Sequence, residues 1–496
     1  MLHTLLFVAY FGVLLILSGY GLHRSHLVIL CHRYARRMKW LRRGPDRPSL
    51  DSDLPYVTIQ LPLYNEATVA VRLLSHVAKI DYPRDRLEIQ VLDDSNDETQ
   101  SIAKKQVDKM IAEGIDAVYV RRPDRVGYKA GALDFGLKQC KGALVAIFDA
   151  DFLPQPEFLR AIVSEFQDPT VGMVQARWGH MNRDHSLLTR VQALMLDGHH
   201  LVENRARFAA GRLFNFSGTG GMWRKEAIHE AGGWQHDTLT EDLDLSYRAQ
   251  LKGWRFVYRE DVMTPAELPE DVSALRAQQY RWAKGTVQTA RKLLGRVLRS
   301  HLTIPQRIEA MFHLTPHFAY PLMVLLSVLL LPALILSPAT DTWTMVLIDL
   351  PLCIGTTGSL AIFYGVAEHA QGRKAALAVW RLPALIALGV GMAPHLTKAV
   401  WDGLQSMSGE FVRTPKKGAK EGRYRAYASL PMTELALGIL SAFSVVASVQ
   451  TGHWFATPFA AMFTFGYAYV AALVILEQTA RRRLVAAQTA TVRVAG

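Results

Sequence analysis

Residues 143–151 read ALVAIFDAD, and this stretch decides the fold. Its first six residues are apolar, which predicts a short buried strand over 143–148. The strand runs directly into Asp149 and Asp151, whose side chains are two residues apart and so project to the same side of an extended chain. Two carboxylates in this position can face one ligand, although an isolated Asp-x-Asp pair is more often a solvated acidic turn.

Strand and helix signals alternate on both sides of this stretch. The apolar patterns predict strands over 57–62, 87–92 and 117–120, and helices over 67–79 and 99–113. Strands separated by helices imply right-handed crossovers, and therefore an α/β domain with a mostly parallel sheet.

Acidic residues follow two of these strands at the edge where such sheets bind ligands. Asp93 and Asp94 end the strand signal over 87–92, just as Asp149 and Asp151 follow 143–148. Ligands of open α/β sheets bind at the carboxyl ends of the strands. Carboxylate oxygens suit Mg²⁺ or Mn²⁺, which bind one or two carboxylates together with substrate phosphates. The two clusters together therefore predict a metal–diphosphate site.

The composition excludes several other classes of protein. Of the 496 residues, 50% are hydrophobic, which is too many for a disordered chain. Three scattered cysteines, Cys31, Cys140 and Cys353, do not make a disulfide scaffold or a zinc site. The net charge of +12 comes from basic residues beside long apolar runs, not from a patch on a folded module. This pattern predicts a membrane protein and no nucleic-acid partner.

Apolar runs and basic flanks predict the membrane topology. The runs long enough to span a bilayer cover 4–22, 315–337, 343–366, 430–449 and 454–476. Basic residues follow the first run and fill 413–425, so both regions are expected in the cytoplasm, with the N-terminus outside. The run over 375–394 contains Arg381, and a complete crossing there would move 413–425 outside. We therefore expect 375–409 to be an interfacial or re-entrant element.

These signals divide the chain into seven segments. They are an N-terminal transmembrane helix (1–22), a basic cytoplasmic linker (23–50), an α/β domain (51–307), transmembrane helices with the interfacial element (308–410), a basic segment (411–425), a C-terminal transmembrane hairpin (430–476) and a cytoplasmic tail (477–496). Asp349 and Glu434 lie in or near apolar runs, where they either line a polar path or pair with a neighbouring helix.

Two further motifs carry polar side chains on predicted helices. Thr240 is a plausible helix N-cap before Glu241 and Asp242, so the acidic pair either complements the helix dipole or supplies a general base. In the helical run over 273–294, Gln278, Arg281 and Trp282 share one face. They fit either a diphosphate and a sugar ring or an ordinary membrane interface.

Five motifs occur here in one order: Pro62-Leu63-Tyr64-Asn65-Glu66, Asp93-Asp94, Asp149-Ala150-Asp151, Thr240-Glu241-Asp242 and Gln278-x-x-Arg281-Trp282. Together they resemble family 2 glycosyltransferases, in particular the membrane-embedded, cellulose synthase-like branch. Residues 411–416, FVRTPK, resemble the gating loop of that branch, which covers the donor site. The resemblance implies a GT-A (Rossmann-like) domain on the cytoplasmic side, combined with an α-helical transmembrane domain, as in a bacterial inner membrane.

The resemblance also implies roles for individual residues. The donor-binding residues would be Glu66, Asp93, Asp94, Lys129, Asp149, Gln278, Arg281 and Trp282. The metal ligands for Mg²⁺ or Mn²⁺ would be Asp149 and Asp151. The catalytic pair would be Asp242, as the base that activates the acceptor hydroxyl, and Glu241. The acceptor and gating residues would be Thr219, Trp282, Phe411, Thr414 and Lys416.

The expected reaction is an inverting transfer of a hexose from a nucleotide sugar, UDP-glucose or GDP-mannose, to an acceptor hydroxyl. A single in-line displacement needs a base on one side and stabilisation of the leaving diphosphate on the other. Inversion of an α-linked donor gives a β linkage. The first hypothesis is a processive β-glucan or β-mannan synthase. The alternative is a lipid glycosyltransferase acting on diacylglycerol or ceramide, and a transporter without catalysis is a third, less favoured hypothesis.

Overall fold

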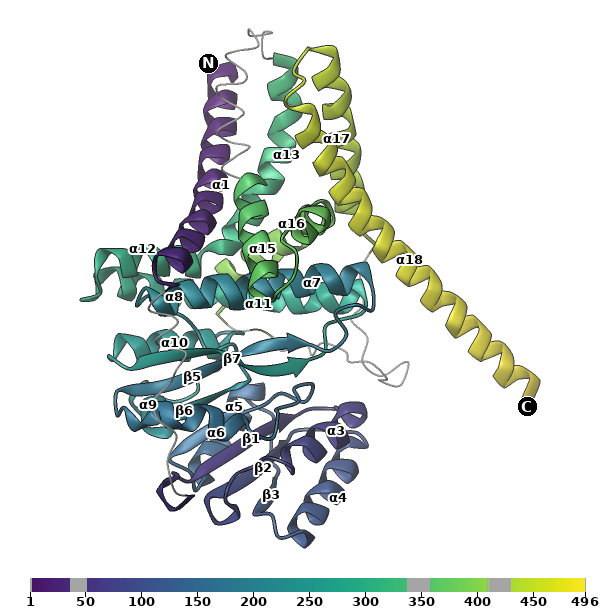
Figure 1. Ribbon diagram of the computed structural model, residues 1–496. Coiled ribbons are helices and arrows are strands. Elements are labelled where there is room, and N and C mark those ends of the chain that lie inside the picture. Colours follow the sequence, from purple (N-terminus) through teal and green to yellow (C-terminus); the bar gives the residue numbers. More distant parts are fainter. Residues whose placement is uncertain (1, 36–50, 337–356, 408, 410–429, 496) are drawn as a thin grey trace.

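The chain divides into a sheet domain and a bundle of upright helices in the computed structural model (Figure 1). The structure describes residues 2–35, 51–336, 357–407, 409 and 430–495. The sheet domain lies at one end, and the helices α1 (Leu2–Arg33), α13 (Ala319–Leu336) and α17 (Met432–Gln450) stand at the other.

Seven strands form one mixed sheet in the order β3-β2-β1-β4-β6-β5-β7. They are β1 (Val57–Leu63), β2 (Leu87–Asp93), β3 (Ala117–Val120), β4 (Leu144–Ile147), β5 (Val171–His180), β6 (Gly221–Arg224) and β7 (Arg255–Ala266). Only β6 runs against its neighbours, because it pairs antiparallel with both β4 and β5. The predicted mostly parallel sheet is therefore confirmed for the part of the chain that carries these strands.

Parallel pairing brings the acidic ends of the strands together. Strand β1 pairs with β2 from Val57↔Leu87 to Leu63↔Asp93, and on its other side with β4 from Val57↔Leu144. The loops that leave β1, β2 and β4 therefore emerge at the same edge of the sheet. This edge carries the acidic clusters that the sequence places at the strand ends.

Helices cover both faces of the sheet. One face packs against α3 (Ala67–Val77), α4 (Thr99–Ala112) and α6 (Phe158–Ile162), and the other against α5 (Tyr128–Gln139), α9 (Lys225–Glu230) and α10 (Glu241–Leu251). Successive side chains of β1 point to opposite faces of the sheet. Ile59 and Leu61 pack into the apolar core on the first face. On the second face the Gln60 side-chain amide donates to Gln90 Oε1 at 3.0 Å, so a side-chain hydrogen bond joins the two strands there.

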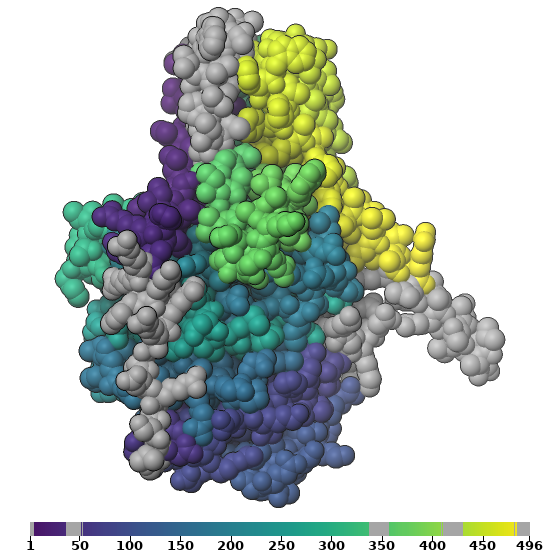
Figure 2. All heavy atoms as spheres, viewed as in Figure 1, coloured from purple at the N-terminus to yellow at the C-terminus, as the bar shows by residue number. Residues whose placement is uncertain are grey.

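A crosswise layer separates the sheet from the upright helices (Figure 1). It contains α7 (Leu187–Gly198), a π-helical turn η4 (His199–Asn204), α8 (Arg205–Ala209), α11 (Val272–Arg299) and α12 (Ile304–Leu314). Figure 2 shows the green atoms of α15 (Ser359–Ala370) and α16 (Ala376–Gln405) filling the space between α1, the C-terminal helices and this layer. Buried residues of α16 pack with residues of α7, α11 and α15 in one apolar cluster.

Five described helices are long and apolar enough to cross a membrane. They cover Thr4–Arg33, Pro316–Leu336, Ala376–Gln405, Met432–Gln450 and Thr457–Ala480. Within 375–409, which the sequence predicted to be an interfacial or re-entrant element, Ala376–Gln405 forms one continuous helix, α16, that is long enough to span and packs on the crosswise layer. Gly391 of α16 lies against Gly466 of α18 (Thr457–Ala495), where a Cβ at Gly391 would come within 2.2 Å of the Gly466 carbonyl oxygen. Small residues permit this close approach of helices.

Three predicted boundaries need correction or lie beyond the described chain. Helix α1 does not end at Leu22 but continues to Arg33, because Leu27 and Leu30 are buried against the sheet domain's outer helices. Helix α18 likewise continues past 476 to Ala495, so the predicted tail is helical. Most of the predicted span over 343–366, including Asp349, falls outside the described residues.

Buried ion pairs join the two parts of the molecule. Glu368 of α15 is fully buried and lies 2.9 Å from Arg381 of α16 and 3.7 Å from Arg183, which follows β5. Glu434 of α17 pairs with Arg276 of α11 at 2.9 Å, as the pairing alternative predicted. The Glu477 carboxylate of α18 accepts from the Ser273 backbone N–H at 3.1 Å, at the start of α11. Glu434 and Glu477 thus hold the start of α11, and Glu368 holds α15 against α16 and the segment after β5.

We expect Glu368→Ala to lower the melting temperature of the detergent-solubilised protein. Removing the carboxylate leaves the Arg381 side chain without its buried counter-charge, whereas Arg183 keeps its ion pair with Asp197. Loss of one partner of a buried pair costs about 3 kcal/mol. Asp108→Ala, which breaks the exposed pair with Lys104 on α4, is the matched control and should leave the melting temperature unchanged. Intrinsic fluorescence during heating measures both. Equal melting temperatures for the two variants would contradict the stabilising role of Glu368.

Candidate active site

A cavity of about 180 Å³ opens at the carboxyl edge of the sheet. Its walls come from the loops after β1, β2 and β4, from the start of α5, from the start of α10 and from α11. The predicted residues that line it are Glu66, Asp94, Lys129, Asp149, Asp151, Glu241, Asp242, Gln278, Arg281 and Trp282. Five motifs that are far apart in the sequence therefore meet in one cavity.

Lys129 stands at the centre of the acidic groups. Its Nζ lies 2.5 Å from Asp149 Oδ1 and donates to the Gly218 carbonyl oxygen at 2.9 Å. Gly218 has a φ of +81°, and a Cβ there would lie 3.0 Å from Asp242 Oδ2, so only glycine leaves this space open. Burial alone would lower the pKa of Lys129, but Asp149 and Glu241 raise it above its usual value, so the lysine stays charged.

The start of α10 carries the acidic pair. Burial, followed by the negative charge of Glu241, raises the pKa of Asp242 to about 7. Burial also raises the pKa of Glu241, although the charge of Lys129 opposes this shift. Thr240 occupies the N-cap position as predicted, but its side chain makes no capping bond and lies 3.2 Å from the Thr289 hydroxyl instead. An aspartate with a pKa near 7 can take up a proton at neutral pH.

The acidic groups after β4 fit a divalent cation bound together with a ligand. Asp149 and Asp151 offer carboxylate oxygens to the same cavity. In the described parts of the chain, no group of three or more His, Cys, Asp or Glu side chains could hold an ion alone. Phosphate oxygens of a ligand would have to complete the coordination, as they typically do for Mg²⁺. The donor set is therefore suited to Mg²⁺ or Mn²⁺ with a diphosphate.

A second cavity, of about 270 Å³, lies on the other side of Asp242. The two cavities share a wall made of Trp178, Leu196, Ser217, Thr240, Asp242, Gln278 and Trp282. From this wall the second cavity extends to His199 and His200 in η4 and to His317 at the start of an apolar helix. One carboxylate is thus accessible from two chambers, and only the second chamber reaches the upright helices.

Comparison with known proteins supports the chain's classification. A family model described as glycosyltransferase like family 2 matches residues 55–285. Glucomannan 4-beta-mannosyltransferase 1 of Oryza sativa subsp. japonica is 34% identical over 473 residues, which cover 88% of this chain and 89% of that protein. The chain belongs to glycosyltransferase family 2. Glucomannan 4-beta-mannosyltransferase 2 of Arabidopsis thaliana is 41% identical over 272 residues, covering 53% of this chain and 51% of that protein.

A solved structure is also similar to this family 2 glycosyltransferase. It is a mannosyltransferase from Pyrobaculum calidifontis in complex with GDP-Man and Mn²⁺, with a TM-score of 0.48 and 24% identity. The match covers 78% of this chain and 99% of that one. The resemblance to the cellulose synthase-like branch is confirmed by the glucomannan relatives, as is the combination of a GT-A-like domain with apolar helices. The protein is a membrane-associated enzyme, and its reaction is a glycosyl transfer.

Two of the predicted donor and acceptor residues lie beneath the cavity surface. Asp93 is buried, and its carboxylate accepts from the Tyr119 hydroxyl at 2.7 Å and from the Ser95 backbone N–H at 2.9 Å. Thr219 is also buried, and its hydroxyl accepts from the Asp149 backbone N–H at 2.9 Å. Both side chains therefore fix loops of the enzyme's first cavity without lining it.

Other predicted residues are placed differently. Asp94 lines the first cavity and lies 2.5 Å from Arg122, so its charge is compensated from within the chain. Gln278, Arg281 and Trp282 share one face of α11, as their spacing predicts. The gating residues Phe411, Thr414 and Lys416 fall outside the described residues.

Several cavity residues were not found from the sequence. Tyr64, Arg125 and Tyr128 line the first cavity, and the Arg125 guanidinium lies 3.3 Å from the centroid of the Tyr64 ring. Tyr64 lies within a quoted motif and Tyr128 is adjacent to Lys129, so their positions in the sequence could have identified them as cavity residues. No sequence signal identified His199 and His200, because the direction of their side chains depends on a π-helical turn.

We expect Thr219→Val to weaken donor binding and Thr219→Ser to preserve it. Valine has nearly the same shape but leaves the buried Asp149 N–H without an acceptor, at a cost of about 1–3 kcal/mol. Titration of purified protein with a nucleotide sugar measures the dissociation constant of the donor. Equal donor affinity in the valine variant would mean that this bond does not position Asp149.

Proposed function

We propose that this enzyme is an inverting, processive β-glycan synthase that transfers mannose from GDP-mannose to the end of a growing glycan. The observation that carries the proposal is the position of Asp242 on the wall between two cavities. One cavity would hold the donor and the other the acceptor, so the base would face the acceptor hydroxyl at the junction. The glucomannan 4-beta-mannosyltransferases among the relatives support mannose as the sugar and a glycan as the product.

The charges around the first cavity suit the departure of a nucleoside diphosphate. Asp242 would take the proton of the acceptor hydroxyl, and Glu241 beside it would keep the Asp242 pKa close to neutral. Arg281 would face the diphosphate from α11, and Lys129 from α5. Mg²⁺ or Mn²⁺, held by Asp149 and Asp151, would neutralise charge on the leaving diphosphate. Displacement at an α-linked donor then gives a β linkage.

The membrane helices suggest where the product goes. The second cavity leads from Asp242 to His317, which lies in the apolar helix Pro316–Leu336. We place the catalytic domain in the cytoplasm, where nucleotide sugars are available, and the glycan would leave through the helical bundle. The basic flanks of the apolar runs support this orientation.

Product analysis tests the proposal directly. The full chain in lipid vesicles is incubated with Mg²⁺ or Mn²⁺ and with labelled GDP-mannose or UDP-glucose in parallel. A high-mass labelled product from GDP-mannose that a β-mannanase degrades is expected. A β-glucanase-sensitive product from UDP-glucose would correct the donor. A single labelled glycolipid would replace the proposal with the lipid glycosyltransferase alternative.

Asp242→Asn should abolish transfer while leaving donor affinity nearly unchanged. The amide keeps the shape of the side chain but cannot accept the proton, and loss of a general base lowers the rate by about 10²–10⁴-fold. Asp237→Asn is the matched control, since Asp237 is exposed on the same loop and lines neither cavity. Transfer rates and donor dissociation constants are compared in both variants. Normal turnover in Asp242→Asn would remove Asp242 from the catalytic role.

The pH dependence of transfer should follow the ionisation of Asp242. Only the deprotonated carboxylate can act as base, so the rate should rise with pH through about 7. Glu241→Gln removes the neighbouring negative charge that raises the Asp242 pKa, so the rise should move to lower pH. The rate at saturating donor is measured between acid and neutral pH. A profile that stays in place in Glu241→Gln would show that another group controls it.

A further inference from the structure

One continuous helical face forms much of the second cavity. Helix α7 leads into the π-helical turn η4 without a break, and the residues facing the cavity are Gln192, Met195, Leu196, His199, His200 and Glu203. Their spacing makes one stripe along the helix. A π-helical turn is rare and is found disproportionately at functional sites. The stripe is apolar at Met195 and Leu196 and polar from His199 onward, where the π turn begins.

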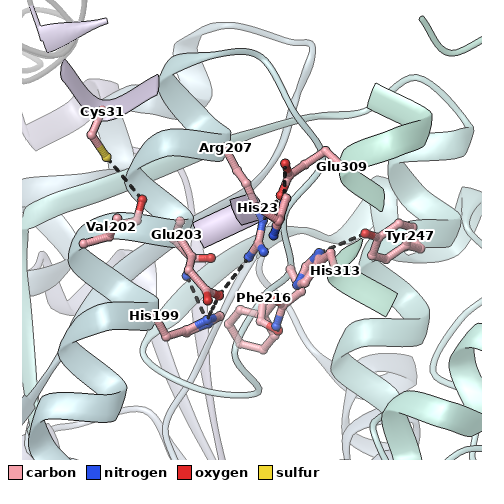
Figure 3. A network of polar contacts seen from close by, with 12 residues as sticks. His23, Cys31, His199, Val202, Glu203, Arg207, Phe216, Tyr247, Glu309 and His313 are labelled. Atoms are coloured by element: carbon pink, nitrogen blue, oxygen red, sulfur yellow. Dashed lines mark hydrogen bonds and ion pairs between the residues drawn. The ribbon is translucent and has the colours of Figure 1, made fainter. Parts of the chain in front are cut away.

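A series of side-chain contacts fixes the π turn to the neighbouring helices. Figure 3 shows Glu203 of the turn joined to Arg207, Arg207 to Glu309 of α12, and Glu309 to His23 of α1. The Arg207 Nε lies 2.9 Å from Glu309, and His23 Nε2 lies 2.9 Å from the other oxygen of the same carboxylate. Cys31 of α1 also donates to the Val202 carbonyl oxygen at 3.3 Å. The turn is therefore held in one orientation.

His200 is the unusual member of this stripe. It is 1% exposed, and neither ring nitrogen has a hydrogen-bond partner among the described residues. Its ring packs between Trp178, at 5.2 Å between centroids, and the stacked ring of Tyr258, at 6.4 Å. Burial is the largest cause that lowers the pKa of His200 well below its usual value, so the imidazole is neutral. Its neighbour His199, by contrast, lies 3.0 Å from Glu203.

The unpartnered atoms of the second cavity point to an uncharged polar ligand. A neutral imidazole offers one donor and one acceptor, and burying them unpaired is unfavourable unless a ligand supplies the partners. Asn215 Oδ1 and Ser217 Oγ of the same cavity also lack partners among the described residues. Sugar hydroxyls donate and accept, whereas an acyl chain would leave all of these atoms unpaired. The aromatic ring of Trp178 beside His200 also suits the flat face of a sugar.

We propose that His200 is a specificity-determining residue that hydrogen-bonds a hydroxyl of the acceptor glycan in the second cavity. This inference rests on the proposed function, because it takes the second cavity as the acceptor side. It commits the acceptor to a carbohydrate and excludes a diacylglycerol or ceramide chain from the position beside His200. The contact aligns the glycan end with Asp242 at the shared wall.

The test measures donor and acceptor dependence separately in the full chain in lipid vesicles. Initial rates with labelled GDP-mannose are recorded against the concentration of short β-linked manno-oligosaccharides. His200→Leu should raise the KM for the oligosaccharide by about tenfold, as expected for the loss of one hydrogen bond to the ligand. The KM for GDP-mannose should stay unchanged. His200→Gln, which keeps a donor and an acceptor, should restore most of the acceptor affinity.

A matched control and a stability readout separate this role from a structural one. Tyr258→Phe removes an unpartnered hydroxyl on the ring packed against His200, lines neither cavity, and should leave both KM values unchanged. His200→Leu should not lower the melting temperature, because the free enzyme loses no hydrogen bond. A fall in melting temperature with both KM values raised would assign His200 to packing and overturn the proposal.

The remaining outcomes are also decisive. An unchanged acceptor KM in His200→Leu would overturn the proposal. So would a wild-type enzyme that makes polymer but neither uses manno-oligosaccharides nor is inhibited by them. If the wild-type enzyme transfers no sugar to any glycan from either GDP-mannose or UDP-glucose, the proposed function itself fails. That result is distinguishable because it is seen before any variant is compared.

Discussion

The parallel pairing of β1 with β2 on one side and β4 on the other is the constraint on which the rest of the enzyme depends. This register places the ends of all three strands at one edge, and three acidic loops follow from it. The concentration of negative charge there is tolerable only because Lys129, Arg122 and Arg281 face it from other elements. Acidic side chains still outnumber basic ones in the lining of the first cavity. Burial keeps water from the charges, so each of them acts more strongly on a ligand than it would in solvent.

Four of the seven strands and the motif positions could be predicted from the sequence, for identifiable reasons, whereas β5, β6 and β7 were not predicted. Strand β3 was predicted to the residue, and β1, β2 and β4 within a residue or two, because each is a short apolar run followed by polar residues. The proximity of Asp149 to Asp94 could be predicted because the carboxyl ends of parallel strands lie at the same edge of the sheet. The face shared by Gln278, Arg281 and Trp282 follows from helical spacing. These features depend on local periodicity and on a topology with few alternatives.

Other features depend on tertiary packing that no local pattern encodes. Asp93 and Asp94 are adjacent in sequence, yet one carboxylate is buried under the sheet edge and the other lines the cavity. The first helix was predicted to end at Leu22, but packing of Leu27 and Leu30 against the crosswise layer extends it. The orientation of His200 depends on the wider π-helical turn in which it lies. That turn is held by the contacts that join Glu203, Arg207, Glu309 and His23, which come from four different elements.

The contacts at the start of α11 have a consequence for how the enzyme is made. This helix carries Gln278, Arg281 and Trp282, yet its first turns are held by Glu434 and Glu477, which lie more than 150 residues later in the chain. During synthesis, the α/β domain emerges from the ribosome long before the hairpin of α17 and α18. The catalytic helix therefore reaches its final support only after that hairpin has entered the membrane. A chain without this hairpin would lack the two carboxylates that hold the first turns of the helix carrying Arg281.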